Sequence, residues 1–268
     1  MSFKYLPLFL TLSLLLLSSC APEIEEEPIP NARVAALFEQ DIQERDSVLA
    51  LVSQATSETF KQAFLELRNY NYTRYSRTDQ FDDTDFLVAF RERTVNHSGP
   101  ISDRRYQILS ADSTGSYDFG FFRQFVSATV EEQDPEDLTP YLFPEDPSFL
   151  SERNYEAYLY RFQQDTLMLD TAAKVAEIRA RPVDGDGKNI RKARFFFDQL
   201  SGQFIAFELE RIDLALFFRE ESQFFVHLQN APDGKQVPYN TRFETRITMP
   251  FKLPQRFRTV ATYSNVSQ

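Results

Sequence analysis

Apolar and polar residues alternate through much of the second half of the chain with the two-residue period of a β-strand. The clearest examples are residues 242–249 and 256–263, where aromatic and aliphatic side chains oppose Arg, Glu and Thr. Successive side chains of a strand point to opposite faces, so each segment has an apolar and a polar face. This pattern is typical of antiparallel strands with one face on a core and the other in water.

The same pattern predicts about ten strands joined mainly by short polar turns. The predicted strands are residues 71–76, 86–90, 105–110, 155–162, 174–181, 190–197, 204–212, 216–228, 242–249 and 256–263. Gly with Asp or Ser at 184–187, 201–202 and 231–234 supplies the residues that tight turns favour. An antiparallel sheet of this size is large enough to curl.

Helical spacing appears on the N-terminal side of these strands. Asn31 is a candidate cap for a helix that ends near Gln54, with a break expected near 46–47, and Ser57 for a second helix that ends near Arg68. Residues 134–154 interrupt the strands with four Pro and several apolar residues, which predicts short helices or a loop lid. The predicted fold class is α+β: one large curved antiparallel sheet with N-terminal helices and a mid-chain helical insertion.

Cys20 is the only cysteine in the chain, and it directly follows an apolar stretch. Lys4, the apolar residues 5–17 and the small residues 18–19 have the layout of a secretory signal peptide. The run Leu-Ser-Ser-Cys at 17–20 resembles a bacterial lipobox. The resemblance implies cleavage before Cys20 and acylation of that residue, which would anchor the mature chain in a membrane.

Three segments follow from this interpretation. Residues 1–19 are predicted to be a lipoprotein signal peptide. Residues 20–31 combine the lipidated Cys20 with an acidic, Pro-containing tether, and residues 32–268 form a single β-rich domain. A lone cysteine leaves no intrachain disulfide, so the stability of the domain must come from packing.

The charge balance argues against nucleic acid as a partner. Removal of residues 1–19 takes away Lys4 as the one charged residue, so the mature chain has 28 basic and 40 acidic side chains and a net charge of −12. Its Lys and Arg residues are scattered along strands, whereas phosphate binding needs a basic cluster.

No motif for catalysis, metal binding or cofactor binding stands out. His97 lies in a turn-like sequence and is expected to be a solvated loop residue, and His227 is expected to be a strand-face residue. The run 184–189 departs from a calcium loop at its fifth and sixth positions, and the acidic residues 79–85 are expected to be solvated. We therefore predict no enzyme, no metal and no cofactor. A hydrolase that uses two carboxylates stays open as a third hypothesis, because 40 acidic residues always supply some pair.

Phenylalanine is the remaining candidate for binding chemistry, with 27 Phe and no Trp in the chain. Several Phe residues lie on neighbouring predicted strands and could line an apolar cavity or fill an ordinary core. The candidate ligand-binding residues are Phe143 in the insertion and Phe197, Phe204, Phe207, Phe218 and Phe225 on the strands.

The order of elements resembles the lipoprotein carrier and receptor superfamily of the outer-membrane sorting pathway (LolA/LolB-like). The likeness lies in the layout of residues 32–265 and in the runs 174–182, 196–202 and 249–254. It implies a half-barrel of about ten to eleven strands, wrapped around helices that cover an acyl-chain cavity. The acidic stretch after Cys20 also resembles surface-export signals, and Ala21 is not the Asp associated with inner-membrane retention.

Together these features predict an outer-membrane lipoprotein, facing the periplasm or the cell surface. We expect it to bind a lipid or a lipoprotein acyl chain without covalent chemistry. The alternative is a structural or protein-interaction lipoprotein of the cell envelope with a solid core. The two differ in whether the interior is hollow.

Overall fold

A computed structural model gives the fold of the chain. It describes residues 31–55, 57–116, 143–144, 146–168, 171–182, 187–215 and 218–268, without the side chains of 31–38, 57, 215 and 218. The chain divides into residues 1–40 and residues 41–268, and the second unit contains the sheet. Cys20 lies outside the described residues, so its lipidation stays a prediction.

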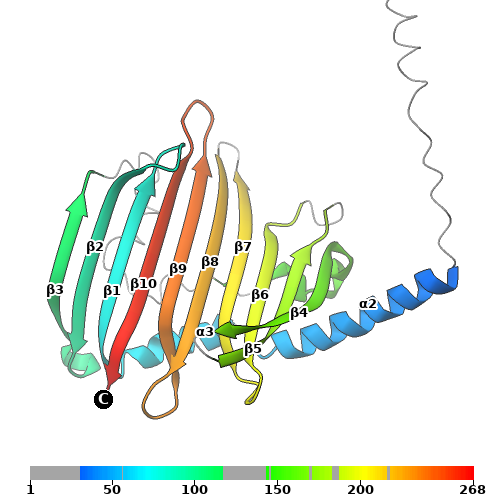
Figure 1. The fold of residues 1–268 in the computed structure, drawn as a ribbon, viewed down its shortest axis with the longest axis horizontal. Coiled ribbons are helices and arrows are strands. Elements are labelled where there is room, and N and C mark those ends of the chain that lie inside the picture. The colour runs from blue at the N-terminus through cyan, green and yellow to red at the C-terminus, as the bar shows by residue number, and fades with distance from the viewer. Residues whose placement is uncertain are drawn as a thin grey trace, which may run out of the picture. The chain divides into compact units, whose positions relative to one another are not determined.

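Ten antiparallel strands form a single sheet in the order β3-β2-β1-β10-β9-β8-β7-β6-β5-β4 (Figure 1). The N-terminal strands are β1 (Asn71–Phe81), β2 (Leu87–Ser98) and β3 (Arg105–Thr114). The others are β4 (Tyr158–Met168), β5 (Thr171–Ala180), β6 (Ile190–Asp198), β7 (Phe204–Ala215), β8 (Phe218–Asn230), β9 (Gln236–Thr248) and β10 (Gln255–Ser267). Strands that are adjacent in the sheet are also consecutive in the chain, except for the pair β1 and β10.

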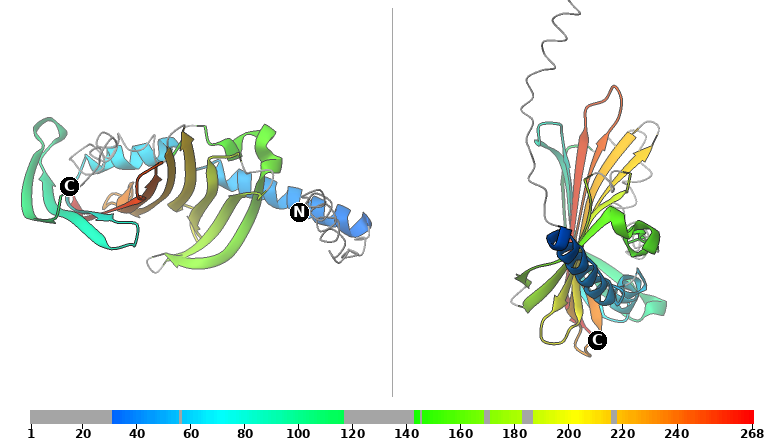
Figure 2. Two further views of the ribbon diagram at one scale, coloured as in Figure 1. Left: turned by 90° about the horizontal axis from the view of Figure 1, so that it is seen from above. Right: turned by 90° about the vertical axis from the view of Figure 1, so that its right-hand side faces the viewer.

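Two helices precede the sheet, as the sequence predicts. Helix α2 spans Asn31–Val52 without the break expected at 46–47, and α3 spans Ser57–Leu67. Among the described residues, neither helix nor any other is both long and apolar enough to span a membrane. Phe60, Phe64 and Leu67 of α3 are buried, because their spacing places them on one helical face. Figure 2 shows α3 lying along one face of the twisted sheet.

The mid-chain insertion contains short helices before β4. They are the 3-10 helices η3 (Ser148–Leu150) and η4 (Glu152–Ala157). Another 3-10 helix, η1 (Ile101–Asp103), lies outside the insertion and links β2 to β3. Residues 134–142 and 145 lie outside the description. The predicted α+β class with N-terminal helices and a short helical insertion is thus confirmed.

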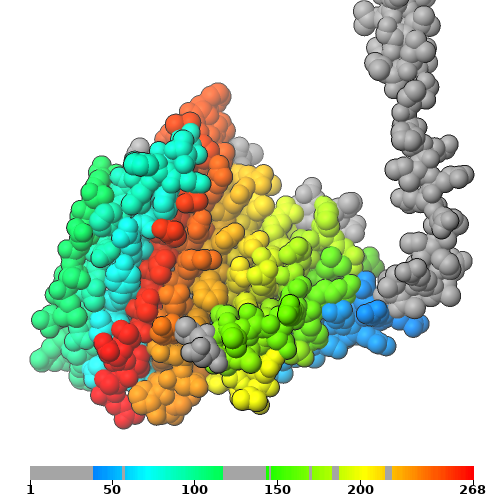
Figure 3. All heavy atoms as spheres, viewed as in Figure 1, coloured from blue at the N-terminus to red at the C-terminus, as the bar shows by residue number. Residues whose placement is uncertain are grey.

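The two faces of the sheet differ in chemistry. The face toward α3 carries most of the buried Phe and Tyr side chains, which form one hydrophobic core. The opposite face is not covered by a described helix along β1, β10 and β9 (Figure 3). Farther along this face, on β5 to β7, Arg194 pairs with Glu177 (Nε–Oε2, 2.8 Å) and with Glu208 (Nη1–Oε2, 3.2 Å), and Lys192 pairs with Glu210. Rows of opposite charges therefore cross neighbouring strands on this helix-free face.

Arg194→Met tests the contribution of this row to stability. Glu177 is buried, so loss of its guanidinium partner leaves an under-satisfied carboxylate, which costs about 1–3 kcal/mol. We expect a lower free energy of unfolding in urea. The control, Arg219→Met, removes a 2.7 Å ion pair with Glu221 in which both side chains are about half exposed, and should cost less than about 0.5 kcal/mol. Equal effects of the two substitutions would contradict a structural role for the buried row.

Candidate functional site

The most distinctive site is a group of phenylalanine rings between α3, the insertion and the strands β6 and β7. We call it the aromatic layer; its members are Phe60, Phe143, Phe149, Phe195, Phe197, Phe204 and Phe207. Phe195 pairs with Phe207 and Phe197 with Phe204 across β6 and β7. Strand pairing itself therefore brings these rings to one face of the sheet.

Phe60 of α3 and Phe143 of the insertion lie over these strand residues. The Phe60 ring centroid is 5.1–5.3 Å from those of Phe143, Phe204 and Phe207. Phe143 in turn lies 5.0 Å from Phe207 and 6.3 Å from Phe195, and both pairs are edge-on. Tilted and edge-on rings at these separations are favourable contacts. Phe143 is 2% exposed, so the space between the described rings is filled.

The rest of the insertion is attached to the sheet by polar contacts. The Tyr160 hydroxyl donates to the Phe149 carbonyl oxygen at 2.8 Å. The hydroxyls of Ser148 and Tyr158 lie 2.6 Å apart, which is hydrogen-bonding distance. These bonds fix η3 and the ring of Phe149, which is edge-on to Phe195 at 6.0 Å.

The structure brings together four of the six candidate ligand-binding residues. Phe143, Phe197, Phe204 and Phe207 belong to the aromatic layer, whereas Phe225 packs on the opposite face with Phe196 and Ala206. Phe218 is the first residue of β8, and its side chain is outside the description. The prediction of one shared face therefore fails for Phe225. It pairs with Glu208 and follows Phe224, so the alternation of side chains turns it outward.

Three further members, Phe60, Phe149 and Phe195, were not among the candidate ligand-binding residues. Phe60 belongs to the apolar face of the predicted second helix, and Phe149 lies in the predicted insertion. Both segments were expected to pack on the sheet. The four-residue spacing of Phe60 and Phe64 indicated that Phe60 lies on the buried face of its helix. That spacing alone does not identify the strands that the Phe60 ring contacts.

The same face of the sheet becomes polar toward the ends of β7 and β9. Ser222 and Thr245 are buried there, and the Thr245 hydroxyl donates to Glu220 Oε1 at 3.1 Å. Burial raises the pKa of the half-buried Glu220 carboxyl, an effect that the Thr245 hydrogen bond opposes. Arg211 pairs with Asp213 at 2.7 Å on the same side. The helix-covered face thus has an aromatic half and a polar half.

Both histidines lie in strands and contact aromatic rings. His97 is not a solvated loop residue as expected: it lies in β2 and its ring stacks on Tyr72 at 4.5 Å, because β2 continues beyond the predicted segment. His227 is a strand-face residue as expected, beside the rings of Phe225 and Tyr239. Burial lowers the pKa of His227, which favours its neutral form.

Three of the acidic residues 79–85 make contacts within the protein, and Asp79 is not solvated as expected, because two arginines surround its carboxylate. Asp79 is buried between Arg77 and Arg258, with an O–N distance of 2.7 Å to each. Asp85 pairs with Arg256 at 3.0 Å. The Asp82 carboxylate accepts a hydrogen bond from the backbone N–H of Phe86. This bond and the hydrogen bonds from Thr84 lower the pKa of Asp82. Across the described residues, no group of three His, Cys, Asp or Glu side chains could hold a metal ion.

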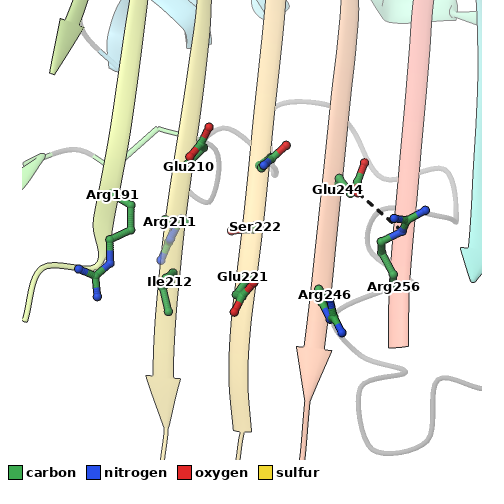
Figure 4. A pocket seen from close by; sticks show the side chains of 10 residues that line it. Arg191, Glu210, Arg211, Ile212, Glu221, Ser222, Glu244, Arg246 and Arg256 are labelled. Atoms are coloured by element: carbon green, nitrogen blue, oxygen red, sulfur yellow. Dashed lines mark ion pairs between the residues drawn. The ribbon is translucent and has the colours of Figure 1, made fainter. Parts of the chain in front are cut away.

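A shallow groove of about 260 Å³ lies on the helix-free face near the ends of β7, β8 and β9 (Figure 4). It is lined by charged side chains, including Glu210, Glu221, Glu244, Arg246 and Arg256. Glu244 and Arg256 form an ion pair across it at 3.7 Å. Ile212 is the one apolar side chain among the residues that line it, and the mixture of charges distinguishes this groove from the aromatic layer.

No protein-family model matches the chain, and no curated protein does. Solved structures similar to it include a DUF1329 family protein from Desulfovibrio piger, with a TM-score of 0.29 and 10% identity over 83% of this chain and 92% of that one. A LolA superfamily protein from Nitrosomonas europaea gives a TM-score of 0.24 and 10% identity over 78% of this chain and 93% of that one. An outer membrane lipoprotein-sorting protein domain from Vibrio parahaemolyticus gives 0.24 and 10% over 79% and 92%. The second of these proteins is described as a member of the superfamily that the sequence resembles.

Glu220→Gln tests the polar half of the face. The pKa of Glu220 is raised in the folded state, so folding favours the protonated carboxyl. The stability that this protonation contributes is complete below the unfolded-state pKa of about 4.3 and is lost as the pH rises through the folded-state pKa. Gln mimics the protonated form and still accepts from Thr245. We expect the variant to have a higher melting temperature than the parent at pH 7 and the same one at pH 4.

The control is Glu221→Gln on the opposite face, where the side chain is about half exposed and the substitution should leave the melting temperature nearly unchanged. Equal melting temperatures of the Glu220→Gln variant and the parent at both pH values would show that the carboxyl is well solvated.

Proposed function

We propose that this protein is an outer-membrane lipoprotein that binds an apolar chain against the aromatic layer, without covalent chemistry. The ligand class is the acyl chain of a lipid or of another lipoprotein. The observation that carries the proposal is Phe143, an aromatic side chain from the Pro-rich insertion that fills the centre of the layer at 2% exposure.

Phe143 is suited to being replaced by a ligand. Its ring contacts are with Phe60, Phe195 and Phe207, and such contacts are non-directional enough for a hydrocarbon chain to reproduce them. Its removal from the layer would leave an apolar gap lined by the same rings. Dry apolar gaps of this kind bind hydrocarbon ligands in other proteins.

The energetics favour an acyl chain over a smaller apolar molecule. Exposure of the Phe143 side chain costs about 1.5–3 kcal/mol, and each buried methylene of a ligand contributes about 0.8 kcal/mol. About four buried methylenes therefore offset the displacement of Phe143, and a longer chain exceeds it. Short apolar molecules would leave Phe143 in place.

The polar half of the same face supports a ligand that has a head group. Ser222 and Thr245 supply hydroxyls beyond the aromatic half, and Arg211 and Glu220 supply charges. A sheet face that changes from aromatic to polar along its strands matches the two ends of an amphiphile. The charged groove on the other face offers no comparable apolar surface.

The sequence supports the membrane address. The signal-peptide layout of residues 1–19, the lipobox-like run that ends at Cys20 and the acidic tether together favour a lipid-anchored envelope protein. A multiply acylated terminus anchors stably, whereas a single chain does so only marginally.

The filled aromatic layer also favours a second candidate function. If Phe143 stays in place, the domain has a solid core and acts through its surface as a protein-interaction lipoprotein of the envelope. The edge strand β3 is exposed along its whole length, and sheet edges of this kind accept an additional strand.

Photo-crosslinking distinguishes these functions. We expect a diazirine-bearing palmitate, added to the full chain in lipid nanodiscs, to label peptides of β6, β7 and the segment around Phe143. Phe143→Ala should increase this labelling about tenfold or more, because the variant no longer has to expose a buried phenyl ring. Phe225→Ala removes a phenyl ring from the opposite face and should leave labelling unchanged.

The same mass spectra report the acylation of Cys20 through the mass of its peptide. Labels confined to the helix-free face or to residues near the anchor, in both the parent and the Phe143→Ala variant, would contradict the ligand site. An unmodified Cys20 would contradict the anchor independently of the ligand result.

A further inference from the structure

Several exposed apolar side chains lie on two neighbouring hairpin tips at one end of the sheet. The β1–β2 tip carries Phe86, which is 70% exposed, and the β9–β10 tip carries Phe251 and Leu253, which are 106% and 71% exposed. Leu214, near the end of β7 at the same end of the strands, is also exposed. Figure 1 shows the β9–β10 hairpin protruding beyond the neighbouring loops.

The two tips are fixed beside one another. Phe81 at the end of β1 pairs with Arg256 at the start of β10. The Arg256 guanidinium lies 4.3 Å from the centre of the Phe81 ring, and its Nη1 is 3.0 Å from Asp85 in the β1–β2 tip. One arginine therefore joins both hairpins through an ion pair and a cation–π contact.

The backbone of each tip holds its phenylalanine outward. Phe251 has a φ of 64°, a left-handed conformation that is uncommon for a bulky side chain. Asp85, directly before Phe86, has the same φ, and the Asp82 carboxylate accepts hydrogen bonds from the N–H groups of Thr84 and Phe86 at 2.9 Å. Such conformations cost about 1–3 kcal/mol and cluster at ligand sites and switch regions.

We propose that this end of the sheet, the apolar tips Phe86, Phe251 and Leu253, inserts into the surface of a lipid bilayer. A bilayer fits better than a protein groove, because the side chains stand on separate protruding hairpins. Lys252 between Phe251 and Leu253 is suited to the head-group level, where a long basic side chain keeps its charge in water.

Charge and chain length agree with this occupant. Asp82, Asp83 and Asp85 offset the neighbouring Arg and Lys residues, so attraction to anionic lipid is not the driving force. An acylated Cys20 would hold the domain near a membrane, and the eleven residues from 20 to 30 can extend about 36 Å. The tips would then restrict how an anchored domain is oriented. The inference requires no ligand in the aromatic layer.

The chain contains no Trp, so a single Trp placed at a tip is a unique fluorophore. Phe251→Trp keeps an aromatic side chain at the tip, and the control Leu200→Trp places one on the 98% exposed turn between β6 and β7, at the opposite end of the strands. Both full chains are reconstituted in phosphatidylcholine vesicles with and without bromine on the acyl chains. We expect a blue shift and bromine quenching of the fluorescence of the Phe251→Trp variant, and neither for the Leu200→Trp variant.

Two results would overturn the proposal. One is fluorescence of the Phe251→Trp variant that bromine does not quench, and the other is equal quenching of both variants, which would mean contact without orientation. If Phe251→Trp fails to fold, Leu253→Trp gives the same readout from the same tip. Quenching at the tip together with no palmitate crosslink in the aromatic layer would support membrane contact and count only against the ligand site.

Discussion

The contact of Phe60 with three phenylalanine rings is the interaction on which the covered face of the sheet depends. It joins α3 to the insertion and to β7, with ring centroids 5.1–5.3 Å apart. Because no disulfide can support the fold, packing of this kind must stabilise it. The same rings therefore serve as the core of the domain and as the proposed ligand surface.

That double role explains why the opposite face carries so much charge. The helix-covered face takes up most of the Phe residues of β6 and β7, and the strand alternation then places Lys192, Arg194 and Glu208 on the other side. Their mutual ion pairs satisfy the charges within the sheet. The charged part of the helix-free face is thereby suited to water, while the apolar hairpin tips lie apart from it at one end of the strands.

Much of this architecture follows from local sequence patterns. The two-residue alternation located all ten strands, and Asn31 and Ser57 marked the helix starts, because these signals depend on neighbours in the chain. The side assigned to Phe225 was wrong, since consecutive strand residues of similar type conceal which of them faces inward. His97 was misplaced because β2 runs to Ser98, an extension set by pairing with β1 and β3. The contacts of Phe60 depend on long-range packing that no local pattern contains.

In the proposed function, an acyl chain takes the place of Phe143 in the aromatic layer. The direct test is a crystal structure of the full chain grown in the presence of palmitate. We expect a hydrocarbon chain against Phe60 and Phe207, with the Phe143 ring moved well beyond its present 5.0 Å from Phe207. A structure in which that distance is kept and palmitate lies elsewhere, or is absent, would contradict the account and leave a solid core.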